Sequence, residues 1–174
     1  GMGAILAYGK HKNEDQRYEF STTFEASFNV MKNLNVRANY SYLHYNYQTM
    51  NRTVNVPYSK YPGEISYLTT GSGVNQLKET QTNHWYQAFN VYGDYMLDIA
   101  DHQIKIMAGY NYETKRLKDI KVSRQGLLSD DLNDLNLAVG DAMTMSGGQN
   151  EYALLGAFYR LNYSYKGCLL YTSP

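Results

Sequence analysis

Residues 18–47 have the sequence YEFSTTFEASFNVMKNLNVRANYSYLHYNY, and this stretch decides the fold. Apolar and polar residues alternate from Tyr18 to Val30, with a single break at Thr22, and again from Leu34 to Tyr42; beyond Leu43 both faces become aromatic. A period of two is the pattern of a β-strand with one apolar and one polar face, whereas a helix would scatter the same side chains around its axis. The stretch therefore predicts a hairpin of two long strands joined by a tight turn at Lys32 and Asn33.

The two faces of this predicted hairpin differ in chemistry. The apolar face is rich in Tyr and Phe, and the polar face is mostly Ser, Thr and Asn, with Glu19, Glu25 and Arg37 as its charged residues. The solvent face of a soluble sandwich is usually richer in Lys and Glu. Each predicted strand has about 13 to 15 residues, two to three times the usual length of about five or six. These features predict a transmembrane β-barrel hairpin.

The composition is compatible with this interpretation. The chain has 174 residues, a formal net charge of zero and 43% hydrophobic residues, and no segment approaches the uninterrupted apolar run of a transmembrane helix. These totals also suit a soluble domain. Tyrosine is the outlier, with 19 residues against 5 Phe and 1 Trp. Phenol rings suit the headgroup boundary of a membrane, although tyrosine is also favoured in strands generally.

The same alternation returns twice later in the chain. It predicts a second hairpin of strands 83–97 and 104–113, with a short turn at 98–102, and a further strand at 151–165 that ends in a turn at Lys166 and Gly167. A short apolar stretch, Ala4 to Lys10, predicts one more strand, and the charged residues from His11 to Arg17 predict a connector.

Two segments without alternation predict long loops, Gln48–Gln81 and Lys118–Gln149. Within the second loop, Leu128, Leu132 and Leu135 have loose helical spacing, which predicts a short helical turn within 128–137 with Ser129 as its cap.

Short turns near 32, 100 and 166 alternate with long connections, which is the layout of an outer-membrane barrel. The predicted fold class is all-β: an antiparallel up-and-down meander of about six strands, with a seventh beginning near Cys168, that forms an open part of a large transmembrane β-barrel. An open sheet edge in lipid would leave backbone groups unsatisfied at several kcal/mol each, so we expect further strands to complete the barrel. Residues 168–174 break the pattern, and a non-native end is one interpretation.

Candidate chemical sites are weak. The four histidines have no metal-site spacing, and the aspartates lack the spacing of a calcium-binding loop, so a solvated charged loop is favoured there. Three tyrosines of the first loop could stack on sugar rings, but packing within the loop or against a capping protein is at least as good an interpretation. These three sets are His11, His44, His84 and His102; Asp130, Asp131, Asp134 and Asp141; and Tyr58, Tyr61 and Tyr67.

Several function classes lack support in the sequence. No nucleophile, base and orienting carboxylate cluster together, so the sequence predicts neither an enzyme nor a cofactor. No basic run suggests nucleic acid. The single cysteine, Cys168, excludes a disulfide within the chain. The ligand-binding residues are unknown at this stage.

Three blocks carry a family resemblance: residues 83–87 (NHWYQ), residues 108–113 (AGYNYE), and residues 151–163 (EYALLGAFYRLNY) followed by Tyr165, Lys166 and Gly167. They resemble the barrel of SusC/RagA-type TonB-linked (TonB-dependent) outer-membrane transporters. The resemblance covers residues 17 to 167, and its last block is the most specific. From Cys168 onward the sequence departs from the family pattern, and the plug domain and TonB box have no counterpart in it.

The resemblance implies that residues 1–174 are part of a TonB-dependent receptor β-barrel domain in a bacterial outer membrane. It implies import of a nutrient, an oligosaccharide or a peptide, through a barrel of about 22 strands. It also implies a SusD-like surface lipoprotein that caps the barrel, and energy from the TonB complex. A structural or adhesive outer-membrane barrel, or a soluble β-rich binding module that buries its Tyr and Phe face against a second sheet, remain the alternatives.

Overall fold

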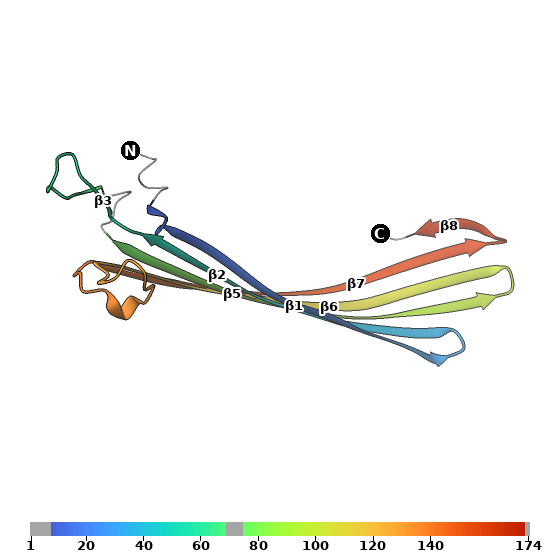
Figure 1. Cartoon of the computed structure of the whole chain (residues 1–174). Helices are drawn as coiled ribbons and strands as arrows, with labels where there is room; N and C mark the ends of the chain where they lie inside the picture. The colour runs from blue at the N-terminus through green and yellow to red at the C-terminus, as the bar shows by residue number, and fades with distance from the viewer. Residues whose placement is uncertain (1–7, 69–74, 173–174) are drawn as a thin grey trace. The chain divides into compact units, whose positions relative to one another are not determined.

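The computed structural model describes residues 8–68 and 75–172, and most of them are in β-strands (Figure 1). The main sheet has six strands in the order β1-β2-β5-β6-β7-β8. Consecutive strands of this sheet are neighbours in space, so the predicted all-β, antiparallel up-and-down meander is confirmed. The strands are β1 (Lys12–Met31), β2 (Leu34–Thr53), β5 (Gln76–Ile99), β6 (His102–Gln125), β7 (Met143–Tyr165) and β8 (Cys168–Thr172).

Two small elements lie between the long strands. Strands β3 (Val56–Tyr58) and β4 (Ser66–Leu68) pair antiparallel as a separate two-stranded sheet. The predicted helical turn is present as one turn of 3-10 helix, η1 (Leu135–Leu137). Its cap is Asp134, whose carboxylate accepts the Asn136 N–H at 2.9 Å, so the prediction of Ser129 as the cap was wrong. No helix among the described residues has the length and hydropathy of a membrane span.

The short turns are confirmed. Two residues each join β1 to β2, β5 to β6 and β7 to β8, and the three turns lie side by side in Figure 1. Lys166 and Gly167 both have positive φ, 48° and 81°, which is the backbone of a type I′ hairpin turn. That geometry matches the right-handed twist of the flanking strands and explains the glycine at the second position.

The strands are longer than predicted, and the bounds of three connections were wrong. The expected connector His11–Arg17 is mostly strand β1, and the two expected loops are reduced to residues 54–75 and 126–142, the first with β3 and β4 inside it. In these segments both faces of the strand carry polar side chains, so the alternation disappears. The backbone ladder does not depend on that alternation and continues.

The ends of the chain bear on two further predictions. The strand expected from Ala4 to Lys10 falls mostly outside the described residues, and Tyr8, Gly9 and Lys10 are not in a strand. The sixth strand of the sheet is instead β8, which pairs with β7 across a register irregularity between Tyr163 and Ser164. Whether residues 168–174 are native stays a prediction.

The chain divides into two compact units, and the long strands contribute segments to both. We call the first the loop unit, because it contains β3, β4 and η1, and the second the turn unit, because it contains the three short turns. The loop unit comprises Gly1–Tyr18, Tyr45–Asn83 and Leu117–Gln149, and the turn unit comprises Glu19–His44, His84–Arg116 and Asn150–Pro174.

The loop unit has a small apolar core and the turn unit does not. Leu77, Leu127 and Ala138 are buried in the loop unit, with Met50 and Leu135 packed against them. Among the described residues of the turn unit, Ala88 is the one apolar side chain that is fully buried. The sheet of the turn unit therefore presents both of its faces to the surroundings.

Candidate functional site

One face of the turn unit is apolar across five strands. Phe20 of β1 contacts Tyr42 of β2 with ring centroids 6.2 Å apart, and alternate residues along each strand share the face. Large side chains on it are exposed, among them Phe24 at 65% and Tyr159 at 73%. No part of the described chain covers this face. We call it the apolar face, and it confirms the alternation predicted from residues 18–47.

The opposite face of the turn unit is polar and internally hydrogen-bonded. Asn90 of β5 donates to the Asn39 side-chain oxygen of β2 at 2.8 Å and accepts from the Asn111 amide of β6. On the neighbouring strands, the Thr23 and Ser41 hydroxyls are 3.1 Å apart. Each amide can donate and accept at once, so the row satisfies itself without formal charge. We call this the polar face.

Tyrosine hydroxyls form hydrogen bonds with charged side chains on the polar face. The Tyr152 hydroxyl donates to the Glu113 carboxylate at 3.0 Å, and Tyr86 bonds to the same carboxylate. Arg37 hydrogen-bonds Tyr92. The polar face is thus hydrophilic but only weakly charged, which suits contact with water and with a varied polar solute.

A glycine permits close packing on the polar face. A Cβ atom at Gly109 of β6 would lie 2.4 Å from the Phe158 ring and 2.6 Å from the Tyr92 Cβ. Such contacts are far inside van der Waals distance, so no larger residue fits without movement. Gly156 of β7 has open space around it and provides a comparison.

Aromatic clusters mark two places on the apolar face. In the first, the His44 and Trp85 rings stack with centroids 5.4 Å apart, and the Arg116 guanidinium lies 5.5 Å from the Trp85 ring centroid. We call this the arginine cluster. Its three residues come from β2, β5 and β6.

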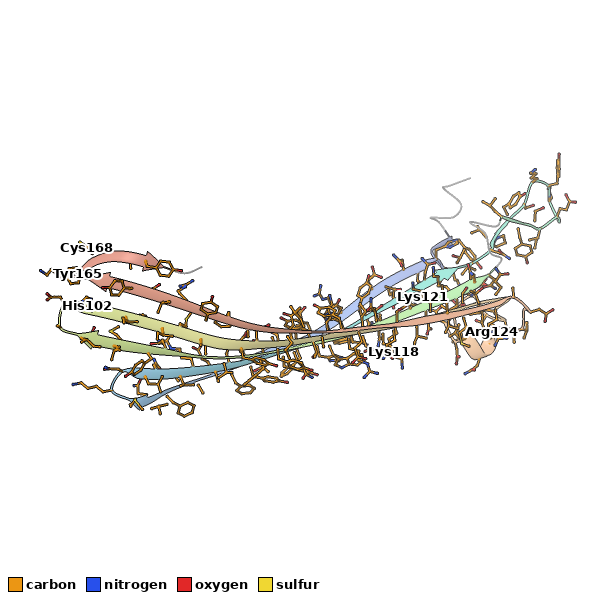
Figure 2. All side chains as sticks on the ribbon, turned by 180° about the vertical axis from the view of Figure 1, so that it is seen from behind. His102, Lys118, Lys121, Arg124, Tyr165 and Cys168 are labelled. Carbon is orange, nitrogen blue, oxygen red and sulfur yellow. The ribbon has the colours of Figure 1, made fainter. Side chains whose placement is uncertain are left out.

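The second cluster lies beside the short turns. The His102 Nδ1 is 2.7 Å from the Tyr163 hydroxyl in a hydrogen bond, and the His102 and Tyr165 ring centroids are 4.9 Å apart. Figure 2 shows His102 and Tyr165 at this end of the sheet, near Cys168. We call it the histidine cluster. Sequence reasoning did not identify either cluster as a unit, because the contacts join different strands.

The connection after β6 is fastened to the sheet by a buried cation in the loop unit. Arg52, 1% exposed, donates to the backbone carbonyls of Thr53, Gln76 and Ser129 at 3.1, 3.2 and 2.9 Å. The Asn75 side chain adds a bond to the Leu127 carbonyl at 2.8 Å. The segment 126–142 is therefore a folded platform at the end of β6. No motif in the sequence signalled Arg52, because its partners are backbone atoms.

Two of the loop aspartates anchor the N-terminal segment. The Tyr8 hydroxyl donates to Asp130 at 2.8 Å, and Lys10 pairs with Asp131 at 2.5 Å. The hydrogen bond to Asp130 raises the pKa of Tyr8 above its ordinary value, since loss of the phenolic proton would place a negative charge against the carboxylate. Asp134 caps η1. No group of three or more His, Cys, Asp or Glu side chains suited to a metal ion occurs in the described part of the chain.

The other predicted site residues are not brought together. Tyr61 and Tyr67 of the β3–β4 hairpin are 68% and 64% exposed, and Tyr58 is half-buried. The four histidines have separate surroundings: His11 accepts the Val54 N–H at 3.4 Å, His84 is 6% exposed, and His44 and His102 belong to different clusters.

An open groove of about 430 Å³ lies in the loop unit. Glu14 and Glu79 contribute acidic groups, and Met50, Ile120 and Val122 contribute apolar side chains. Beside the groove residues of β6, Lys121 lies 3.8 Å from Asp119, and farther along the strand Arg124 donates to the Leu135 carbonyl at 3.3 Å (Figure 2). These two cations thus belong to local contacts of the loop unit.

Comparison with solved structures identifies the fold. The chain is similar to a chain of the RagAB peptide transporter, with a TM-score of 0.78 and 20% identity over 94% of this chain. It is similarly close to the RagAB peptide importer in the open-open state, with a TM-score of 0.77 and 20% identity over 94%. For the RagAB peptide importer in the closed-closed state the TM-score is 0.72, with 18% identity over 91% of this chain.

In each of the three structures the chain spans 17% of the length of the matched chain. No protein-family model matches the sequence, and no curated protein matches it. The similarity in structure agrees with the SusC/RagA-type resemblance of the sequence, and the fold that this resemblance implies is confirmed.

Proposed function

We propose that the chain is part of the wall of an outer-membrane transporter that imports nutrients, with peptides as the first substrate class to test. The observation that carries the proposal is the shared fold with the RagAB peptide transporter over 94% of this chain. The matched structures are those of a peptide transporter, so oligosaccharides, the other class implied by the sequence resemblance, come second.

The two faces of the turn unit support this role. A transmembrane barrel needs strands that are apolar toward lipid and polar toward the lumen, and the exposed Phe and Tyr side chains opposite the asparagine row meet both needs. Strands β1 and β8 are the edges of the six-stranded sheet. In a membrane these edges need neighbouring strands, so we propose that residues 1–174 form part of a larger barrel domain.

The loop unit offers a surface for partners. Tyr61 and Tyr67 on the β3–β4 hairpin and Leu128 on the platform are all more than 60% exposed. We propose that this surface meets a SusD-like surface lipoprotein or the substrate, and that the TonB complex supplies energy to the complete protein. Exposed apolar groups on short, well-held elements are suited to such contacts.

The test of the import function is a strain that lacks the complete gene, supplied in turn with a peptide mixture as its amino-acid source and with oligosaccharides as its carbon source. We expect slower uptake of labelled peptides, restored by the wild-type gene, and unchanged oligosaccharide uptake. A protein that reaches the outer membrane but whose loss alters no import would contradict the proposal. A defect in oligosaccharide uptake alone would reassign the substrate class.

A variant of the hairpin tests the role of the loop surface. Tyr61→Ala combined with Tyr67→Ala should reduce uptake at unchanged levels of folded protein. The matched control is Met145→Ala on β7, which removes an equally exposed apolar side chain outside this surface. Equal uptake in all three proteins would show that the hairpin contacts neither substrate nor capping partner during import.

A further inference from the structure

The polar face has a carboxylate with hydrogen-bonding capacity to spare. Glu113 of β6 is half-buried and accepts the Tyr152 hydroxyl at 3.0 Å, and Tyr86 bonds to the same carboxylate. A carboxylate has about four lone-pair positions, so about two stay open. In the part of the chain that the structure describes, no ion pair holds Glu113. Two phenols thus hold a negative charge in place without neutralising it.

The strand pairing surrounds Glu113 with neutral side chains on β5 and β7. The positions opposite and diagonal to it on the polar face follow from the hydrogen-bonded registers of β5 with β6 and of β6 with β7: Tyr86, Ala88 and Asn90 on β5, and Tyr152, Leu154 and Gly156 on β7. Among the described residues, the nearest cation in this pairing is Lys115, two residues along β6 on the same face. No ion pair joins Lys115 to Glu113 there.

The asparagine row ends beside Glu113 in an unused acceptor. The Asn111 amide donates to the Asn90 side-chain oxygen, and the Asn90 amide donates to Asn39. The side-chain oxygen of Asn111, two residues from Glu113 on the same face of β6, accepts no hydrogen bond from the described chain. The surface around Glu113 therefore offers acceptors and a negative charge. Such a surface complements a ligand group that has a positive charge and several N–H donors.

We propose that Glu113 and Asn111 form a binding site for the primary ammonium group of a peptide, either its N-terminus or a lysine side chain. The ammonium donates to the open positions of the Glu113 carboxylate and to the Asn111 side-chain oxygen, while Tyr86 and Tyr152 hold the carboxylate. Lys115 competes for the carboxylate and keeps the affinity moderate, as passage of a solute requires. The inference rests on the proposed function, because it requires the polar face to line the path of an imported peptide.

The experiment uses the complete protein that carries this chain, purified in neutral detergent and immobilised, and identifies by mass spectrometry the short peptides that it retains. The peptides are amidated at the C-terminus and have three forms: a free N-terminus without lysine, an acetylated N-terminus with one lysine, and an acetylated N-terminus without lysine. We expect about tenfold greater retention of an ammonium-bearing form than of the third form, because charge-assisted hydrogen bonds are the strong ones. Retention of the first or the second form distinguishes the two sources of the ammonium group.

Two variants of β6 test which side chain binds the ligand. Glu113→Gln keeps the size of the side chain and an oxygen for the phenols but removes the charge, so the preference for ammonium-bearing peptides should disappear. Lys115→Gln removes the competing cation and should strengthen their retention. The matched control is Glu25→Gln, which removes a carboxylate from the polar face of β1 and should retain peptides as the wild type does.

Equal retention of the three forms by the wild type, or an unchanged preference in Glu113→Gln, would overturn the inference. Loss of the preference in Lys115→Gln would also overturn it, because the lysine and not the carboxylate would then bind the ligand. Failure of the proposed function is a separate result, in which a strain without the complete gene imports peptides at the normal rate. Heat-modifiable migration on a gel verifies that each variant is a folded barrel.

Discussion

The turn unit and the loop unit obtain their stability in different ways. The turn unit leaves Phe24, Phe28 and Tyr159 exposed and buries almost no apolar side chain of its own. The loop unit buries Leu77, Leu127 and Ala138 and fastens its platform with Arg52. The turn unit must bury its apolar face against molecules outside the described chain. The loop unit buries part of its apolar surface within itself. Perturbations should therefore act on the two units in different ways.

The largest expected effect is in the loop unit, at Arg52. Arg52→Met removes the guanidinium that donates to the carbonyls of Thr53, Gln76 and Ser129, so we expect a loss of about 3 kcal/mol from the stability of the platform. The measurement is limited proteolysis, with cleavage within 126–142 appearing in the variant. Lys60→Met is the control, because Lys60 is exposed and has no hydrogen bond in the described chain. If the protease leaves the platform of Arg52→Met uncut, Arg52 does not hold the segment 126–142 in place.

The next effect is in the turn unit. Gly109→Ala forces a Cβ atom into the Phe158 ring and the Tyr92 side chain, and overpacking of this kind costs about 2 kcal/mol. Urea unfolding of the complete protein in detergent should show the loss. Gly156→Ala should be neutral, since nothing lies within 4 Å of its added methyl group. Equal stability of the two variants would mean that the polar face is looser than the structure shows.

A smaller effect is expected in the asparagine row of the turn unit. Asn90→Ala removes two hydrogen bonds, but water can replace them on a wet face, so the loss should be about 0.5 kcal/mol. The measurement is the free energy of unfolding in detergent. The control is Asn29→Ala, which removes an exposed asparagine from the polar face of β1. A loss of several kcal/mol would indicate that the face is dry, and the assignment of the two faces would be wrong.

The smallest effect is a pH dependence in the loop unit. Because the folded-state pKa of Tyr8 is raised by Asp130, this contact stabilises fully below the unfolded pKa of about 10 and is lost as pH rises through the folded value. Hydrogen exchange of residues 8–17 should accelerate above about pH 10, and less so in Tyr8→Phe. The Lys10 pKa, raised by Asp131, acts in the same direction. Identical alkaline profiles for wild type and Tyr8→Phe would contradict this contact.

The sequence predicted the structure of the turn unit better than that of the loop unit. In the turn unit each strand separates lipid-suited from water-suited side chains, so alternation at Phe20 to Val30 or Ile104 to Tyr112 was enough to find strands, faces and short turns. In the loop unit polar side chains predominate on both faces of the strands, and the strand ends running to Thr53 and Gln125 were interpreted as loops. Alternation therefore reports the surroundings of a strand and not the presence of its backbone ladder.

The site was harder to predict than the fold. Arg52 binds backbone carbonyls, and Arg116 meets Trp85 only because β5 and β6 are paired in one register. Neither set of contacts corresponds to a motif that can be recognised in the sequence around the arginine. The contacts that define the histidine and arginine clusters join residues far apart in the chain.

The central claim is that the turn unit has one face toward lipid and one toward water. Its most direct test is single-cysteine scanning of β6 from Ile104 to Asn111 in the complete protein in membranes, after Cys168→Ser. A charged maleimide should label cysteines at Lys105, Met107 and Asn111 and spare those at Ile104, Ile106, Ala108 and Tyr110; Gly109 is left unchanged, because a larger side chain there would clash with Phe158. Labelling of both sets alike, or of the second set alone, would contradict the account.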